Sequence, residues 1–290
     1  MKSLLASRAR DVIGVLLLCG VMGSCANRSV VTTEGALSYG PEVKKIRIEM
    51  TNGTLDVAVL EGGASASEVT WQGGLRRDSL SVAGLEEIEK VSTLMSGELD
   101  PAEPGTFVVR CPVSPAGIEG MIAYEGSIRV SETMPIEVVV SNNGHVTMVG
   151  RKAFSRIRTR RGDLRFERCF GGIEANTGQG VLIAYDHEGD LDVSTGLGDM
   201  QVFLNKLGKR VTLSTGQGTV QCHVPGESKF EVDARAEIGR IGNDFGFEVR
   251  KVGEYSAAMT GVRGSGEAEV ILRTASGHIS LIRRSPKSGS

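Results

Sequence analysis

The chain has 290 residues, of which 40% are hydrophobic and only 4% aromatic, and its formal net charge is -2 at pH 7. This balanced charge excludes a general affinity for nucleic acid, because such affinity needs a basic surface. The 4 histidines and 5 cysteines have no spacing typical of a zinc site, so we expect no metal and no cofactor.

Residues 1–24 predict an export signal that is cleaved. Lys2, Arg8 and Arg10 precede an apolar stretch, 12–21, which is too short for a stable membrane span. The sequence Val-Met-Gly-Ser-Cys that ends at Cys25 resembles a bacterial lipobox, in which a peptidase cuts before the cysteine and the thiol is lipidated. We therefore expect an exported lipoprotein, anchored through Cys25 at the outer membrane or cell surface. A cleaved signal without lipidation is the alternative.

The segment after the signal divides into a tether and a strand-rich cap. Residues 25–40 are polar and without pattern, which predicts a tether. Residues 43–59 alternate around Asn52-Gly53, which predicts a β-hairpin. An apolar stripe beyond Asp78 predicts one helix near 78–96, followed by a proline-containing loop. We expect residues 41–135 to form this cap over the rest of the chain.

Glycines return at a fixed interval through the second half of the chain. Three residues before each glycine stands a serine or threonine, and two residues after it stands an apolar residue. The phased positions are Ser141, Gly144 and Val146; Thr159, Gly162 and Leu164; Thr177, Gly180 and Leu182; Thr195, Gly198 and Met200; Thr215, Gly218 and Val220; and Thr274, Gly277 and Ile279. A period of about 18 residues indicates a solenoid.

This repeat predicts an all-β fold, a β-solenoid of residues 136–283 with two short strands in each coil. Apolar residues two and four positions after each glycine share one parity, so both point inward. The glycines permit positive φ at the turn, and we expect the threonines to act as corner residues whose hydroxyls bond the turn backbone. Residues 284–290 are predicted to be a disordered tail.

Three cysteines remain after cleavage before Cys25. Cys222 occupies an inward position of the repeat, so we expect a small buried side chain. Cys169 lies at a different phase, which argues against a disulfide with Cys222, and Cys111 lies in the predicted cap.

Two stretches of this sequence resemble the bacterial adhesin-like family called DUF4097. They are Met134 to Gly150, which reads MPIEVVVSNNGHVTMVG, and Thr274 to Leu281, which reads TASGHISL. The similarity covers about residues 43–283 and implies a β-solenoid in an exported or membrane-tethered protein. It supplies no catalytic residues.

The best candidate binding residues are basic. Arg156, Arg158 and Arg160 alternate with Ile157 and Thr159, which predicts an outward stripe. Together with Arg161 they could hold a phosphorylated or carboxylated surface polysaccharide, or a lipid headgroup. The competing interpretation is structural, because Arg156 and Glu174 share a phase one coil apart and should pair.

Acidic residues offer weaker candidates. Asp190 and Asp192 could bind calcium, but a solvated turn is the favoured interpretation. Asp163 and Asp199 follow their glycines at the same phase, two coils apart, and are the only carboxylate pair we consider for a polysaccharide-active enzyme.

We therefore expect a non-enzymatic, surface-anchored, adhesin-like binding or scaffold module of the bacterial envelope. Its expected partners are the membrane, through the lipid anchor, and an anionic surface polysaccharide or an envelope protein, with no nucleic acid. One alternative is an envelope-stress or signalling accessory that acts through protein contacts. A polysaccharide-active β-helix enzyme is the third hypothesis.

Overall fold

The computed structural model describes residues 29–60, 67–77, 95–112 and 122–285. These residues form strands and no helix, which confirms the all-β prediction, and no helix within them could cross a membrane. All strands belong to one hydrogen-bonded sheet. They are β1 (Ser29–Ser38), β2 (Lys45–Val59), β3 (Glu68–Arg77), β4 (Ser96–Leu99), β5 (Thr106–Arg110), β6 (Ile122–Val130), β7 (Ile136–Val149), β8 (Ser155–Arg161), β9 (Leu164–Glu167), β10 (Ile173–Gln179), β11 (Leu182–Leu197), β12 (Met200–Gln217), β13 (Val220–Pro225), β14 (Phe230–Ile238), β15 (Ile241–Asn243), β16 (Val249–Lys251), β17 (Ala257–Arg263), β18 (Ala268–Ser276) and β19 (Ile279–Arg284).

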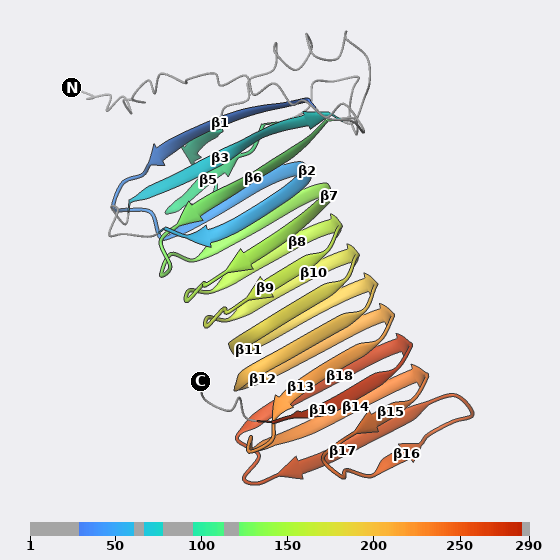
Figure 1. Ribbon diagram of the computed structural model, residues 1–290. Coiled ribbons are helices and arrows are strands. Elements are labelled where there is room, and N and C mark those ends of the chain that lie inside the picture. The colour runs from blue at the N-terminus through green and yellow to red at the C-terminus, as the bar shows by residue number, and fades with distance from the viewer. Residues whose placement is uncertain (1–28, 61–66, 78–94, 113–121, 286–290) are drawn as a thin grey trace, which may run out of the picture.

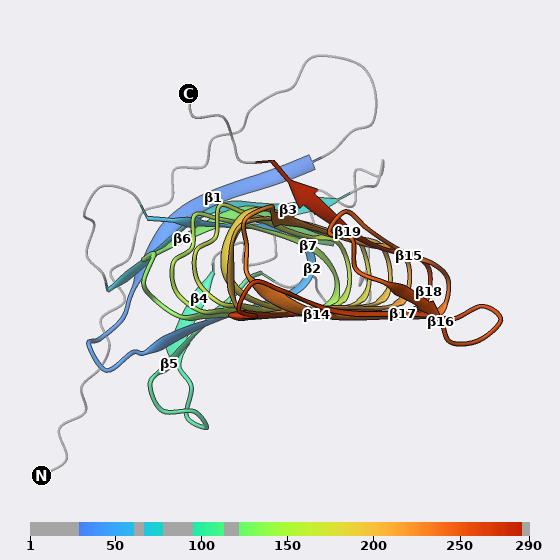
Figure 2. The same ribbon diagram turned by 90° about the horizontal axis from the view of Figure 1, so that it is seen from below.

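The sheet winds into stacked, flattened coils. Ile173 of β10 lies opposite Ser155 of β8 on one side and Leu191 of β11 on the other, each 18 residues away, in parallel pairing. In the view of Figure 2 successive coils lie one behind another, each shifted sideways from the last. Inward side chains of both strands fill the interior with aliphatic groups, such as Leu182, Ala184 and Val193. The 18-residue period of the sequence is therefore one turn of a solenoid-like stack.

The first corner of each coil is built from the phased glycines and threonines. Gly162 has a φ of 129°, and a side chain there would collide with the carbonyl oxygen of Gly144 in the preceding coil. The hydroxyl of Thr177 donates to the carbonyl oxygen of Gly162 at 3.1 Å, and Thr215 does the same to Gly198 at 3.0 Å. These contacts confirm that the threonines are corner residues that bond the turn backbone.

In three coils the second corner also has a left-handed residue, which the glycine pattern did not reveal. Gly150, Arg168 and Asp186 occupy this position in three successive coils, with φ of 74°, 50° and 54°. Only the first of them is glycine, so the corner imposes strain on the other two.

The predicted hairpin of residues 43–59 is wrong, because β2 is one continuous strand that turns a coil corner. Its two halves both pair parallel to β7, and Gly53 lies opposite Gly144. The alternation of apolar residues does not distinguish a hairpin from a continuous strand, because Ile48 and Leu55 are fully buried in the continuous strand as well. Gly53 is thus an earlier member of the glycine series.

Coil order in space differs from order in sequence at both ends of the stack. β2 lies between β5 and β6 on one side and β7 on the other. The coil that comes last in the sequence consists of β18 and β19. In the stack it lies between two coils that precede it in the sequence, that of β12 and β13 and that of β14 and β15 (Figure 1). The stack therefore begins before residue 136, at strands that sequence analysis assigned to the cap.

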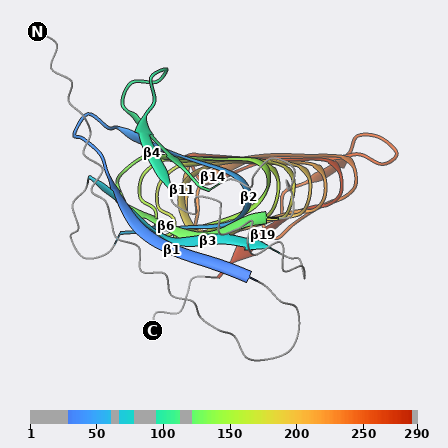
Figure 3. The ribbon, with the colours of Figure 1, turned by 90° about the horizontal axis from the view of Figure 1, so that it is seen from above.

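Antiparallel strands close the two ends. At one end β3 pairs with β6, β1 with β3, and β4 with β5 (Figure 3); at the other, β17 pairs with β14 and β16 with β17. The predicted tether of residues 25–40 is thus mostly the edge strand β1, which the free edge of β3 binds. Most of the helix predicted near 78–96 falls on residues 78–94, which lie outside the described part of the chain. At its predicted end, Ser96 is the first residue of β4.

The predicted tail, 284–290, begins with an ordered residue. Arg284 ends β19, and its guanidinium bonds Asp186 at 2.7 Å and Asn205 at 3.1 Å. Residues 286–290 lie outside the described part of the chain.

Candidate anion-binding surface

The basic stripe lies on the outer face of β8, as its alternation predicts. Ser155, Ile157 and Thr159 are buried, whereas Arg158 and Arg160 are exposed and Arg156 is half-buried. Arg161 is also exposed, at the corner that leads to β9. The structure therefore brings all four predicted arginines to one coil, three of them in a line across its face.

Arg156 is engaged within the stack. Its Nη2 lies 2.6 Å from Oε2 of Glu174, which is its Cα partner on β10. This hydrogen bond raises the pKa of Arg156 above its usual value. The structural pairing proposed from the common phase is confirmed, so Arg156 is the least available of the four for a ligand.

Arg158 shares the carboxylate of Glu137 with two cations of β2. Its Nη1 lies 3.3 Å from Oε1 of Glu137, whose other oxygen accepts bonds from Arg47 at 3.0 Å and Lys45 at 3.2 Å. Burial alone would raise the pKa of Glu137, but the bonds from Arg47 and Lys45 outweigh it and hold that pKa below its usual value. Arg158 is 56% exposed, so most of its guanidinium still faces solvent.

Arg160 and Arg161 have no ion pair among the described residues. Gly178 of the next coil lies against the backbone of Arg160, and Gln179 is the partner of Arg161. Neither neighbour is charged, so these two cations carry uncompensated charge at the edge of the face.

Arg151, which lies shortly before the stripe in the sequence, is fully buried. Its guanidinium donates to the carbonyl oxygens of Ser131, at 2.5 Å, and Met134. Burial lowers its pKa to about 10. Arg151 therefore ties a turn to the stack and contributes nothing to the surface stripe.

Other arginines of this coil face elsewhere. Arg165 lies on the opposite face, on β9, where it pairs with Glu167 and packs over the Tyr185 ring at 5.2 Å. There Tyr185, Phe203 and His223 form a stacked row with centroids 5.1 and 4.1 Å apart. Because these rings cover one another's faces, the row stabilises the coils and leaves only ring edges for a ligand.

The carboxylates considered for catalysis hold the backbone. Oδ1 of Asp163 accepts the Val181 amide at 2.8 Å, and Oδ1 of Asp199 accepts the Thr219 amide at 2.7 Å, each in the next coil. Asp163 and Asp199 are two coils apart, and Val181 occupies the equivalent position in the coil between them. Both side chains therefore act as corner bridges between coils.

The acidic cluster near residue 190 is occupied in the same way. Oδ1 of Asp190 accepts the amides of Lys209, at 2.6 Å, and Arg210, at 3.1 Å, and Asp186 pairs with Arg284. His187 is buried, with Nε2 3.3 Å from the carbonyl oxygen of Asp190. This geometry supports the turn interpretation.

The cysteines of the folded part are buried and unpaired. Cys111, Cys169 and Cys222 form no disulfide, which confirms the expectation for Cys169 and Cys222. Burial raises the pKa of Cys222 to about 12, so the thiol stays protonated. Cys25 lies outside the described residues.

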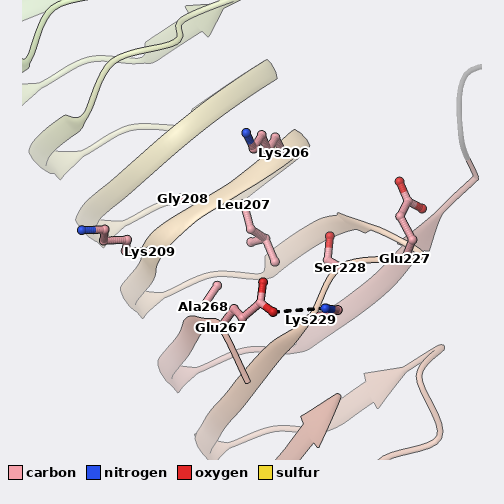
Figure 4. Close-up of a pocket in the computed structure, with 9 residues that line it drawn as sticks. All are labelled: Lys206, Leu207, Gly208, Lys209, Glu227, Ser228, Lys229, Glu267 and Ala268. Carbon is pink, nitrogen blue, oxygen red and sulfur yellow. Dashed lines mark hydrogen bonds and ion pairs between the residues drawn. The ribbon is translucent and has the colours of Figure 1, made fainter. Parts of the chain in front are cut away.

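The surface also has a recess of about 470 Å³ (Figure 4). The sequence did not predict it, because it is formed by three turns that are far apart in the chain. It is lined by Lys206, Leu207, Gly208, Lys209, Glu227, Ser228, Lys229, Glu267 and Ala268. Lys229 is paired with Glu267 at 3.1 Å, and Figure 4 shows Lys209 turned away from the other side chains. Its cations do not converge, so it is a weaker candidate than the β8 face.

Comparisons with known proteins give one family and several structures. The family model described as Toastrack DUF4097 matches residues 24–282, and no curated protein matches the chain. A "putative cell adhesion protein" from Clostridium sporogenes is 16% identical, with a TM-score of 0.39 over 87% of this chain and 100% of that chain. A "putative lipid binding protein" from Parabacteroides distasonis is 10% identical, with a TM-score of 0.40 over 86% of this chain and 96% of that chain.

Proposed function

The chain belongs to the Toastrack DUF4097 family, and on this premise we propose that it is a non-enzymatic binding module of the bacterial envelope that holds an anionic polymer on the outer face of β8. The observation that carries the proposal is the pair of uncompensated cations, Arg160 and Arg161, beside the solvent-facing Arg158. Guanidinium groups bind carboxylate and phosphate in bidentate geometry.

Rigidity favours this face as a binding surface. β8 is paired on both sides, with β7 and β10, so the backbone positions from which its outward side chains project are fixed before a ligand arrives. A ligand then loses less free energy in ordering the protein. The carboxylates Asp163 and Asp199 already accept backbone amides, which supports a binding role over a catalytic one.

Anchoring completes the proposal. We assign lipidation to Cys25, from the lipobox-like sequence before it. Only residues 26–28 separate Cys25 from β1, so a lipid there would hold the first residue of β1 within about 15 Å of the membrane, at roughly 3.4 Å per residue. The expected location is the outer membrane or cell surface.

The test uses the soluble mature chain, residues 26–290. Its binding to polygalacturonate and to dextran sulfate would be measured against neutral dextran, at about 0.01 M and about 0.15 M ionic strength, where the Debye length falls from about 30 to about 8 Å. We expect binding to the acidic polymers alone, weaker at the higher salt. An Arg158→Ala/Arg160→Ala variant should bind about tenfold more weakly, from two exposed contacts of about 0.7 kcal/mol each.

The control removes equal charge elsewhere. Arg250→Ala/Lys251→Ala alters two exposed cations of β16, at the far end of the stack. Equal losses in both double variants would show that only overall charge matters and would remove β8 from the proposal.

A role in envelope signalling through protein contacts is the second candidate, supported by apolar exposure at one end. Val252 and Tyr255 are each more than 60% exposed on the connection between β16 and β17. Exposed apolar groups that gather in one place are typical of protein interfaces. A purified envelope protein that binds the wild-type chain, but not a Val252→Ser/Tyr255→Ser variant, would support this role.

A further inference from the structure

Phe154 continues the line of the arginine stripe. It has the same parity as Arg156, Arg158 and Arg160, so all four side chains project from one face of the coil, roughly 7 Å apart along the chain. Phe154 is 45% exposed although it is a large aromatic residue. The outer face of this coil therefore presents one ring followed by three guanidinium groups.

The ring of Phe154 is held in position. On the next coil Gly172 lies against it, and a Cβ at Gly172 would be 3.3 Å from Cδ2 of Phe154. The Arg156 guanidinium lies 5.6 Å from the ring centroid and is itself fixed by Glu174. A rigid, half-exposed ring is an effective anchor, because little side-chain entropy is lost when a ligand covers it.

The neighbouring coil leaves room for an extended ligand. Glycines stand beside both ends of the line, Gly172 at Phe154 and Gly178 at Arg160, and Asn176 is the partner of Arg158. At Gly172 and Gly178 the next coil therefore presents no side chain beside the two ends of the line.

The carboxylate of Glu137, on the opposite side of β8 in β7, does not repel an anion bound along the line. Glu137 lies next to Arg156 and bonds Arg158, but its side chain is only 6% exposed. Lys45 and Arg47 already neutralise it. Glu174, on the next coil, pairs with Arg156, so the exposed charge that remains along the line, at Arg158 and Arg160, is positive.

We infer that this line, Phe154 to Arg160, is a binding track for one strand of an acidic polysaccharide. A sugar ring stacks its apolar C–H face on Phe154, and acidic groups further along the polymer bond Arg158 and Arg160. The inference rests on the proposed function and specifies its ligand, since one ring and two cations spread over about 20 Å suit an extended polymer better than an isolated headgroup.

Stacking and charge contacts differ in their salt dependence, which separates the two parts of the track. Contacts of exposed charges weaken as salt screens them, whereas the burial of apolar surface does not depend on ionic screening. Loss of the Phe154 ring should therefore weaken binding by a similar factor at low and at high salt.

The experiment measures binding of polygalacturonate to residues 26–290 carrying Phe154→Leu or Phe154→Tyr. We expect about tenfold weaker binding for Phe154→Leu at both salt concentrations, and nearly unchanged binding for Phe154→Tyr, which keeps the ring. Leu197→Ala is the control, because Leu197 is a similarly exposed apolar residue, at 47%, two coils away. Thermal unfolding of each variant shows whether the fold is intact.

Each outcome decides between the claims. If Phe154→Leu binds like wild type while Arg158→Ala/Arg160→Ala binds weakly, the aromatic track is wrong and the proposed function stands. If wild type binds no acidic polysaccharide, both fail. Tighter binding to a single-stranded oligonucleotide than to polygalacturonate would also overturn the inference, because bases stack on aromatic rings as well.

Discussion

The hydroxyl of Thr195 donates a hydrogen bond of 3.3 Å to the carbonyl oxygen of Gly180 in the preceding coil. Thr274 makes the same bond to Gly218, although 56 residues separate them. The same hydrogen bond therefore forms between coils that are neighbours in space, whether or not they are consecutive in the sequence. It closes each coil onto the one before and makes the corner the natural place to test the fold.

Thr195→Val tests this hydrogen bond with little change in shape. We expect the free energy of unfolding to fall by about 1 to 2 kcal/mol, because the Gly180 carbonyl loses a buried donor. Urea denaturation measures it. Thr212→Val, at an outward position of β12, should change stability by less than about 0.5 kcal/mol; equal effects of the two changes would refute the role of the hydroxyl.

Gly162→Ala tests the close approach at the same corner. The φ of 129° and the nearby Gly144 carbonyl oxygen leave no room for a methyl group, so we expect a loss of at least about 2 kcal/mol. Gly242→Ala is the matched control, since nothing lies within 4 Å of a Cβ there. A Gly162→Ala protein as stable as that control would contradict the corner geometry.

Arg168→Gly should stabilise the protein. Arg168 has a φ of 50° at the second corner, and glycine removes a strain of about 1 kcal/mol. Arg160→Gly removes the same kind of side chain from a regular strand, where glycine should cost about 0.5 to 1 kcal/mol. Thermal and urea unfolding of both variants would give shifts of opposite sign, and two losses would disprove the strain.

Glu137→Gln should make stability less dependent on pH. The folded-state pKa of Glu137 lies below its usual value, so its charge contributes stability that is complete above the unfolded pKa of about 4.3 and is lost as the pH falls through the folded pKa. Urea unfolding at about pH 7 should show a loss of about 1 to 3 kcal/mol in the variant. The difference from wild type should shrink near pH 3, and a constant difference would argue against ionised Glu137.

Much of this architecture could be predicted from local pattern. The alternation in Arg156-Ile157-Arg158-Thr159-Arg160 fixes which side chains face outward in any strand, and the glycine period fixes which residues meet across coils, as Arg156 and Glu174 do. The inward place of Cys222 follows from the same parity. These properties depend on neighbours a few residues away or one period away, so the sequence carries them directly.

The sequence by itself determined an all-β chain of coils with an arginine stripe facing solvent. Only the tertiary structure decided that β18 and β19 lie inside the stack and that β2 turns a corner where a hairpin was predicted. It also decided that Arg151 is buried and that Arg158 shares Glu137 with Lys45 and Arg47 of β2. The physical reason is that strands of equal parity can pair with many partners, and the entropy of loop closure changes slowly with loop length. The choice among those partners rests on the packing of whole coils, which no local pattern records.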